Sequence, residues 1–261
     1  MLNLSILIAI LLGIVQGLTE FLPVSSSGHL VLLGQVFYLH ENNVLFFIIL
    51  HLATLFAVLF VFKNSVIDLV KHPFSKKSKM LVVATIITLV LAFLFKDFFE
   101  NSFSGNLLAV SFLITALFLL FAQWVAKNNK HPQLLNHKNT AVMGLFQGLA
   151  ILPGISRSGA TISSAIVQGI NKKDAAEFSF LMSIPIILAS LVWELLKFDP
   201  TVTTIKLLPT AFGFVFALLF GIIAIKIMLK IIEKAKYYYF STYLIALSIF
   251  LMLNSLVFNW F

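Results

Sequence analysis

Two short polar segments, set in otherwise apolar sequence, contain residue types that together suit phosphate chemistry. The first contains Glu20, three serines at 25–27 and His29, and the second, residues 153–161, is centred on Arg157. A hydroxyl beside a base is the usual pattern of an activated nucleophile, an imidazole titrates near neutral pH, and a guanidinium matches phosphate oxygens. This set suits phosphoryl transfer, in which positioning and charge stabilisation dominate catalysis.

Glu20 is the only acidic residue among the first 40 residues, most of which are apolar. A charge at mid-membrane costs about 2.5–3.5 kcal/mol on the insertion scale, so a carboxylate there is retained for a reason. We favour a functional role. The alternatives are a structural ion pair with Arg157 and a position near the membrane surface.

The serines at 25–27 precede a second apolar stretch, where a helix is expected to begin. Free backbone N–H groups at a helix start attract anions, phosphate above all. The alternative, N-capping by one of the three hydroxyls, is compatible with this, because another can react. His29 shares this polar tip, which favours a functional role, whereas His51 lies within an apolar span, where a structural role is favoured.

Arg157 is the sole arginine of the protein, and it is expected at membrane depth. Its planar fork binds phosphate oxygens and is never neutralised. The alternative is that it only neutralises Glu20. The candidate partners around it are hydroxyls that donate hydrogen bonds and glycines that let the backbone approach a ligand: Ser156, Ser158, Thr161, Gly154 and Gly159.

The composition indicates that lipid, not water, surrounds the chain. Of 261 residues, 60% are hydrophobic and 11% are charged, against about 45–50% and about a quarter in soluble domains. Six stretches have the length of a membrane-spanning helix: residues 44–62, 79–96, 106–126, 174–196, 206–230 and 239–259. Two more apolar regions, 1–40 and 139–171, are each interrupted by Pro, Gly, Ser and a charge, which predicts two half-helices joined by a polar tip.

The two interrupted regions are related by an internal repeat. With a shift of 131 residues, seven of the sixteen positions from 13 to 28 are identical in the second region: Gly13, Gln16, Gly17, Leu18, Ser25, Ser27 and Gly28. The shift also brings the first three spans onto the last three. We therefore predict an all-α integral membrane protein of two units, 1–131 and 132–261. Each unit has one re-entrant hairpin and three of the six spans, and the odd number inverts the second unit. Hairpins that span the membrane fully, which would place the loops differently, are the alternative.

The lysines predict the orientation. In this topology fourteen of the seventeen lysines fall on one side of the membrane. The positive-inside rule places that side in the cytoplasm and both termini outside. The net charge of +8 therefore reflects orientation. No basic face with interleaved aromatic residues indicates nucleic-acid binding.

The sequence resembles the undecaprenyl-diphosphatase family, also called bacitracin-resistance proteins. The first family motif is an acid or Gln followed four residues later by Glu, here Gln16 and Glu20. The second, Pro-Gly-x-Ser-Arg-Ser-x-x-Thr, is complete from Pro153 to Thr161. The length and the spacing of the motifs also fit, so the resemblance covers essentially the whole chain.

The resemblance implies removal of the terminal phosphate of undecaprenyl pyrophosphate, which recycles the lipid carrier for peptidoglycan synthesis and confers bacitracin resistance. It implies a divalent cation, Mg²⁺ or Ca²⁺, and a pocket that opens to the outer face of the bacterial cytoplasmic membrane. Gln16 replaces an acid that many members have, so a cation held by Gln16 and Glu20 would have one carboxylate fewer. A homodimer is one option for the assembly.

By resemblance the catalytic residues are Glu20, Ser26, His29 and Arg157, and the phosphate-binding residues are Ser25, Ser27, Ser156, Ser158, Thr161 and Gly154. In the predicted mechanism Ser26 attacks the terminal phosphorus, Glu20 is its base or orients the cation, and His29 is a general acid or base. Attack by His29 or by water is an alternative, and the sequence does not decide which serine lines the pocket. A lipid flippase or transporter and a purely structural membrane protein are the rival functions.

Overall fold

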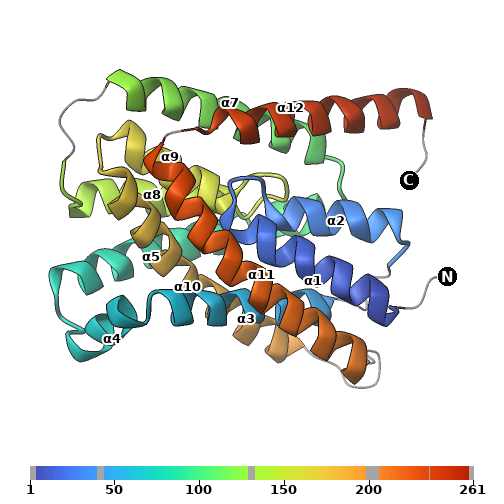
Figure 1. Cartoon of the computed structure of the whole chain (residues 1–261), viewed down its shortest axis with the longest axis horizontal. Helices are drawn as coiled ribbons and strands as arrows, with labels where there is room; N and C mark the ends of the chain where they lie inside the picture. The colour runs from blue at the N-terminus through green and yellow to red at the C-terminus, as the bar shows by residue number, and fades with distance from the viewer. Residues whose placement is uncertain (1–3, 40–43, 129–132, 198–205, 235, 259–261) are drawn as a thin grey trace.

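The computed structural model describes residues 4–39, 44–128, 133–197, 206–234 and 236–258, and this part of the chain is helical apart from loops and an isolated bridge between Gln133 and Ile170. The helices are α1 Ile6–Phe21, α2 Ser26–Val36, α3 Val44–Val61, α4 Lys63–Lys71, α5 Lys76–Leu94, α6 Lys96–Ser102, α7 Leu108–Asn128, α8 His137–Leu149, α9 Arg157–Val167, α10 Lys172–Lys197, α11 Leu207–Glu233 and α12 Tyr238–Leu253, which continues as a π-helical turn at Asn254–Phe258 (Figure 1).

The prediction of an all-α integral membrane protein is confirmed. Five of the described helices, α5, α7, α10, α11 and α12, are each long and apolar enough to cross a membrane. The pair α3–α4, which bends by 84° between its two helices, brings the number to six. The predicted spans thus correspond to α3, α5, α7, α10, α11 and α12. Residue 259, at the end of the last predicted span, lies outside the described residues.

The exposed side chains agree with a surface that faces lipid. Phe93 and Leu196 are 78% and 79% exposed, and many other large apolar side chains on the spanning helices are exposed as well. In water such a surface would be an aggregation liability. In lipid it is the expected outside of a helical bundle, because the acyl chains are as apolar as the side chains.

The two interrupted regions each form a pair of short helices joined by a tip. The helices α2 and α9 have 11 residues each, so each is about 16 Å long at 1.5 Å per residue, too short for a hydrocarbon core of about 30 Å. Figure 1 shows α1 and α2 in the right half of the molecule and α8 and α9 in the left half, with the two tips meeting near the middle.

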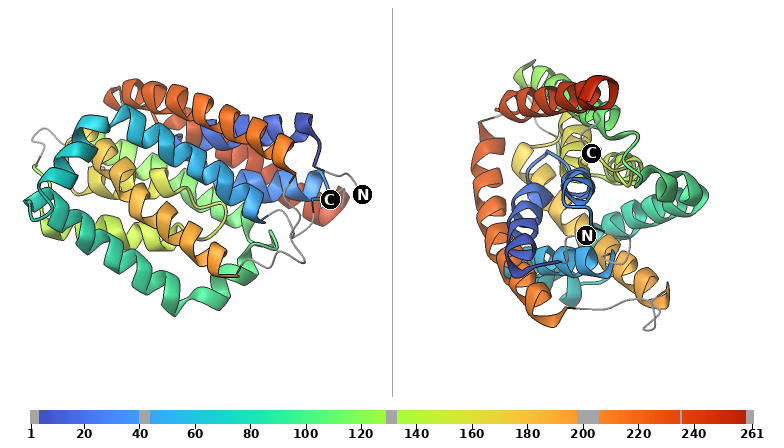
Figure 2. Two further views of the ribbon diagram at one scale, coloured as in Figure 1. Left: turned by 90° about the horizontal axis from the view of Figure 1, so that it is seen from below. Right: turned by 90° about the vertical axis from the view of Figure 1, so that its right-hand side faces the viewer.

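The first helix of each hairpin packs against a spanning helix that belongs to the other half of the sequence. The helix α1 lies along α11, and α8 lies along α5. Glycines permit both contacts, because a Cβ on Gly17 would lie 2.6 Å from the Ala217 carbonyl oxygen and one on Gly144 would lie 2.5 Å from the Ala84 carbonyl oxygen. The right panel of Figure 2 shows the first hairpin enclosed by the longer helices.

Candidate active site

Glu20, at the end of α1, is the centre of a buried polar cluster that joins the two hairpins. Its Oε1 accepts a hydrogen bond from Arg157 Nη2, and the two side chains form an ion pair. Its Oε2 accepts from the Ser26 hydroxyl at 2.5 Å and from Gln16 Nε2 at 3.0 Å. Glu20 is only 6% exposed, so these bonds replace the water that a carboxylate would otherwise require.

Arg157, the first residue of α9, uses one arm of its guanidinium for Glu20. The other arm, Nη1, is buried and has no hydrogen-bond partner among the described residues. Burying an unsatisfied donor costs about 1–3 kcal/mol. A residue that served only to neutralise Glu20 would gain nothing from this arrangement, so the second arm is suited to an anion that binds beside the carboxylate.

The three adjacent serines have three different environments. The Ser25 hydroxyl caps α2 by accepting from the Gly28 N–H at 3.3 Å, and it also accepts from the Gly154 N–H at 3.1 Å. The Ser27 hydroxyl lies 3.3 Å from that of Ser25. Only Ser26, among the three, has its hydroxyl on Glu20. The structure therefore brings one hydroxyl of the run to a base.

The backbone at the first tip is strained, because Ser25 has φ of +68°. Such a conformation costs about 1–3 kcal/mol for a residue with a side chain, and it persists where the surroundings hold it, often at functional sites. Here the second hairpin holds it through the Gly154 N–H and through the Ile155 carbonyl, to which the Ser25 hydroxyl donates at 3.3 Å.

The second tip is bonded to the first in a similar way. The Ser158 hydroxyl donates to the Leu22 carbonyl of the first hairpin at 3.1 Å. Gly154 has φ of +93°, a backbone conformation that favours glycine. The tips touch so closely that a Cβ on Gly28 would lie 2.8 Å from the backbone of Gly154. The two predicted motifs thus form one buried structure.

Like those of Ser25, Ser27 and Ser158, the predicted phosphate-binding hydroxyls of Ser156 and Thr161 form hydrogen bonds within the fold. Ser156 caps α9 by accepting from the Gly159 N–H at 3.1 Å. Thr161, one turn beyond Arg157, donates to the Arg157 carbonyl at 2.8 Å and lies 2.5 Å from the Ser179 hydroxyl of α10. The structure does not bring the Thr161 hydroxyl to the Glu20 carboxylate, and it directs this side chain toward α10.

His29 lies beside the cluster, and no hydrogen bond joins it to Ser26 or Glu20 in the described part of the chain. Its Nδ1 is 2.7 Å from the Ser25 carbonyl oxygen, and its Nε2 is 2.6 Å from the Tyr243 hydroxyl of α12. No signal in the sequence distinguishes Tyr243 from the other tyrosines of this region, so sequence reasoning missed it.

His51 of α3 approaches the carboxylate from another direction. Its Nε2 lies 3.7 Å from Glu20 Oε2, and its Nδ1 donates to the Phe47 carbonyl at 2.8 Å. Sequence reasoning favoured a structural role for it, although a titratable side chain inside an apolar span was a signal that pointed to the site. His51, which lies outside both hairpins, is therefore a neighbour of Glu20.

The residues also fit a divalent cation held partly by a substrate. Among the described residues no group of three or more His, Cys, Asp or Glu side chains could hold a metal ion. Glu20 supplies one carboxylate, and the buried Gln16 Oε1 has no hydrogen-bond partner in the described part of the chain. Mg²⁺ is usually bound by one or two carboxylates together with substrate phosphates, which matches this small set of oxygen ligands.

Comparison with known proteins confirms the family that the sequence resembles. Residues 9–250 match the family described as bacitracin resistance protein BacA. The chain is 44% identical to an undecaprenyl-diphosphatase of Carboxydothermus hydrogenoformans over 90% of this chain and 92% of that protein. It is 38% identical to an undecaprenyl-diphosphatase of Treponema denticola over 94% of this chain and 96% of that protein. This chain therefore belongs to the bacitracin resistance protein family.

Proposed function

We propose that this protein removes the terminal phosphate from undecaprenyl pyrophosphate and so produces undecaprenyl phosphate. The names of its relatives support the substrate and the reaction. The observation that carries the proposal is the Ser26 hydroxyl, 2.5 Å from a Glu20 carboxylate that also pairs with Arg157, whose Nη1 has no partner among the described residues. These groups provide a nucleophile, its base and an anion-binding site. The relatives' names give no support to a transporter.

In the proposed reaction Ser26 attacks the terminal phosphorus and Glu20 takes the hydroxyl proton. The bond from this phosphorus to the bridging oxygen breaks, and undecaprenyl phosphate leaves. Water then attacks the phosphoserine, phosphate is released, and Glu20 returns the proton to Ser26. His29 is a general acid or base in this proposal. Attack by His29 or by water is the alternative, and Ser26 is favoured because its hydroxyl, among the three adjacent serines, is the one that donates to Glu20.

Arg157 binds the diphosphate through the arm that Glu20 does not use. The charge of a guanidinium stabilises the equatorial oxygens of the transferring group. A Mg²⁺ or Ca²⁺ ion, when bound, would neutralise diphosphate charge, with Glu20 and Gln16 as its protein ligands. The backbone N–H groups at the starts of α2 and α9 add positive potential at the two tips.

The proposal includes an inverted repeat. The pairs α1–α11 and α8–α5 support it, because each joins a hairpin to the equivalent span of the other unit. The opposed directions of the hairpins in Figure 1 support it as well. Such repeats place their sites near the bilayer midplane, where both tips would then meet the substrate.

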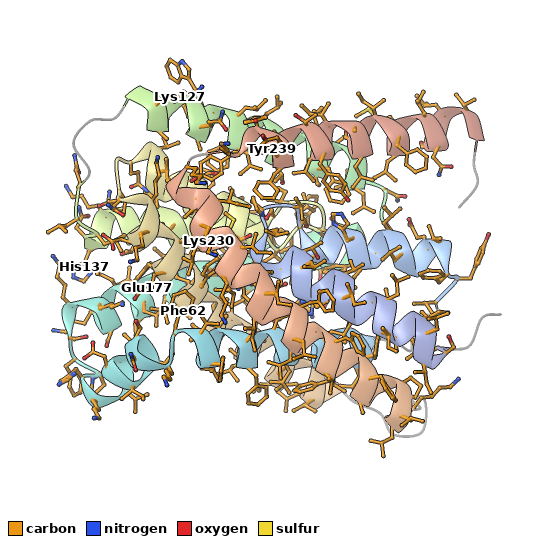
Figure 3. All side chains as sticks on the ribbon, viewed as in Figure 1. Phe62, Lys127, His137, Glu177, Lys230 and Tyr239 are labelled. Atoms are coloured by element: carbon orange, nitrogen blue, oxygen red, sulfur yellow. The ribbon has the colours of Figure 1, made fainter. Side chains whose placement is uncertain are left out.

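We also propose that the protein lies in the bacterial cytoplasmic membrane with its site open to the outer face. In Figure 3, Lys127 and His137 lie toward the left end of the molecule, and in Figure 1 α1 begins at the right end, where α12 also ends. The positive-inside rule then supports a cytoplasmic left end. A site open to the right end would receive the carrier where it is released during wall synthesis.

The test is phosphate release by the detergent-purified protein from undecaprenyl and farnesyl pyrophosphate, with Mg²⁺, Ca²⁺ or EDTA. Glu20→Gln and Arg157→Ala should each lose nearly all activity. Glu177→Gln is the matched control, since Glu177 pairs with Lys77 at 2.7 Å outside the cluster. The proposal is supported if the wild type and Glu177→Gln release phosphate and the Glu20→Gln and Arg157→Ala variants do not. A folded wild type that releases no phosphate from either lipid contradicts it.

A further inference from the structure

The hydrogen bonds of His29 define which of its nitrogens can exchange a proton. Nδ1 is 2.7 Å from the Ser25 carbonyl oxygen, and because a carbonyl only accepts, Nδ1 carries a hydrogen. In the neutral ring Nε2 is then the acceptor, and the Tyr243 hydroxyl donates to it at 2.6 Å. Nε2 is therefore the nitrogen whose lone pair can exchange a proton, and in this structure the Tyr243 hydroxyl occupies that lone pair.

Aromatic contacts fix the plane of the same imidazole. The edge-on ring of Phe112 in α7 has its centroid 5.4 Å away, and the Tyr243 ring in α12 lies 5.7 Å away at 12° to the imidazole plane. The helices that carry these two rings are themselves bonded, since the Ser248 hydroxyl donates to the Ala109 carbonyl at 2.7 Å. His29 is 8% exposed, whereas Tyr243 is 46% exposed.

We infer that Tyr243 is a positioning residue for the phosphatase reaction and that it acts through His29. This inference rests on the proposed function and adds to it a residue from the last helix, far from both motifs in the sequence. The phenol hydroxyl stabilises the tautomer with hydrogen on Nδ1 and keeps Nε2 in one direction. Without the phenol hydroxyl, the imidazole retains its hydrogen bond to the Ser25 carbonyl but loses the hydrogen bond at Nε2 that also fixes its orientation.

A merely structural tyrosine would give different consequences from a positioning one. Tyr243→Phe keeps the ring and its packing and removes a single oxygen. We expect kcat to fall about 10-fold, less than the roughly 10²–10⁴-fold that a general acid or base contributes, because the imidazole itself remains, while KM and the melting temperature stay close to wild type. Because Tyr243 acts through His29, the double variant with His29→Gln should be no slower than His29→Gln alone.

The control is Tyr239→Phe, which removes the same oxygen one helical turn earlier in α12, where Tyr239 is exposed. It should leave kcat unchanged. A second readout is the ¹⁵N signal of His29 Nε2 in the labelled protein, assigned with His29→Gln. Tyr243→Phe should shift this signal, because it removes the hydrogen bond to Nε2, and Tyr239→Phe should not.

The outcomes separate this inference from the proposed function. A fall in kcat that is absent in the His29→Gln background, together with the Nε2 shift, supports it. An active wild type with an inactive Glu20→Gln variant and an unaffected Tyr243→Phe variant would overturn the role of Tyr243 alone. Losses that add fully in the double variant would also overturn it, because they would show an effect independent of His29. A wild type without phosphatase activity would overturn both proposals.

Discussion

Ser25 and Gly154 are 129 residues apart, and the Gly154 N–H donates to the Ser25 hydroxyl at 3.1 Å. This bond joins the tips of the two hairpins at the place where Ser25 has its unusual backbone conformation. The hydroxyl next to it, on Ser26, donates to Glu20. Adjacent residues of the same type therefore have different tasks, one in holding the tips together and one in the proposed chemistry.

We expect Ser26→Ala to lower phosphate release by at least about 100-fold, in line with the loss of a nucleophile and its partner, with little change in melting temperature. Ser25→Ala should lower the free energy of unfolding by about 1–3 kcal/mol, because the Gly154 N–H loses its buried acceptor. Phosphate release and thermal unfolding of both variants, measured side by side, would test this. Near-normal turnover by Ser26→Ala would exclude the serine mechanism.

Arg157→Lys tests whether the second arm of the guanidinium has a function. An ammonium can keep the ion pair with Glu20, but it lacks the fork that holds a phosphate at the same time. We expect kcat/KM to fall by about 10-fold or more, the equivalent of a lost charge-assisted hydrogen bond, with stability near wild type. If Arg157→Lys had normal kcat/KM, the arginine would serve only to neutralise Glu20.

Gly17→Ala should destabilise the contact between α1 and α11. The new Cβ would lie 2.6 Å from the Ala217 carbonyl oxygen and 2.8 Å from the Gly221 nitrogen, so helix backbones must separate, at a cost of about 1–3 kcal/mol. Gly34→Ala in α2 is the matched control, because no atom lies within 4 Å of its Cβ. Thermal unfolding should show a lower melting temperature only for Gly17→Ala. Equal melting temperatures would contradict the packing argument.

Gln16→Glu should lower the concentration of Mg²⁺ or Ca²⁺ that gives half-maximal phosphate release. The amide has one buried oxygen without a partner among the described residues, and a carboxylate there would provide a second charged ligand beside Glu20. Titration of each cation into EDTA-treated wild type and variant measures the shift. An unchanged cation requirement would show that position 16 does not contact the ion.

Much of the fold and part of the candidate site could be predicted from the sequence because the signals are local. The length of each apolar run indicates a spanning helix, and Pro, Gly and Ser within an apolar region indicate where a helix must stop. A charge in such a region is costly, which is why Glu20 and Arg157 could be singled out, with an ion pair between them as the structural alternative. Their ion pair is present in the structure.

The sequence by itself therefore determined the membrane class, the spans, the two interrupted regions and the acidic and basic residues of the site. Only the tertiary structure decided which serine meets Glu20, that Thr161 faces α10, that His51 approaches Glu20, and that Tyr243 contacts His29. Side chains at successive helical positions point about 100° apart, so Ser26 and Ser27 diverge, whereas Ser25 precedes α2 with φ of +68°. Tyr243 and His29 are 214 residues apart, and their contact depends on the packing of α12 against α7, which no local pattern encodes.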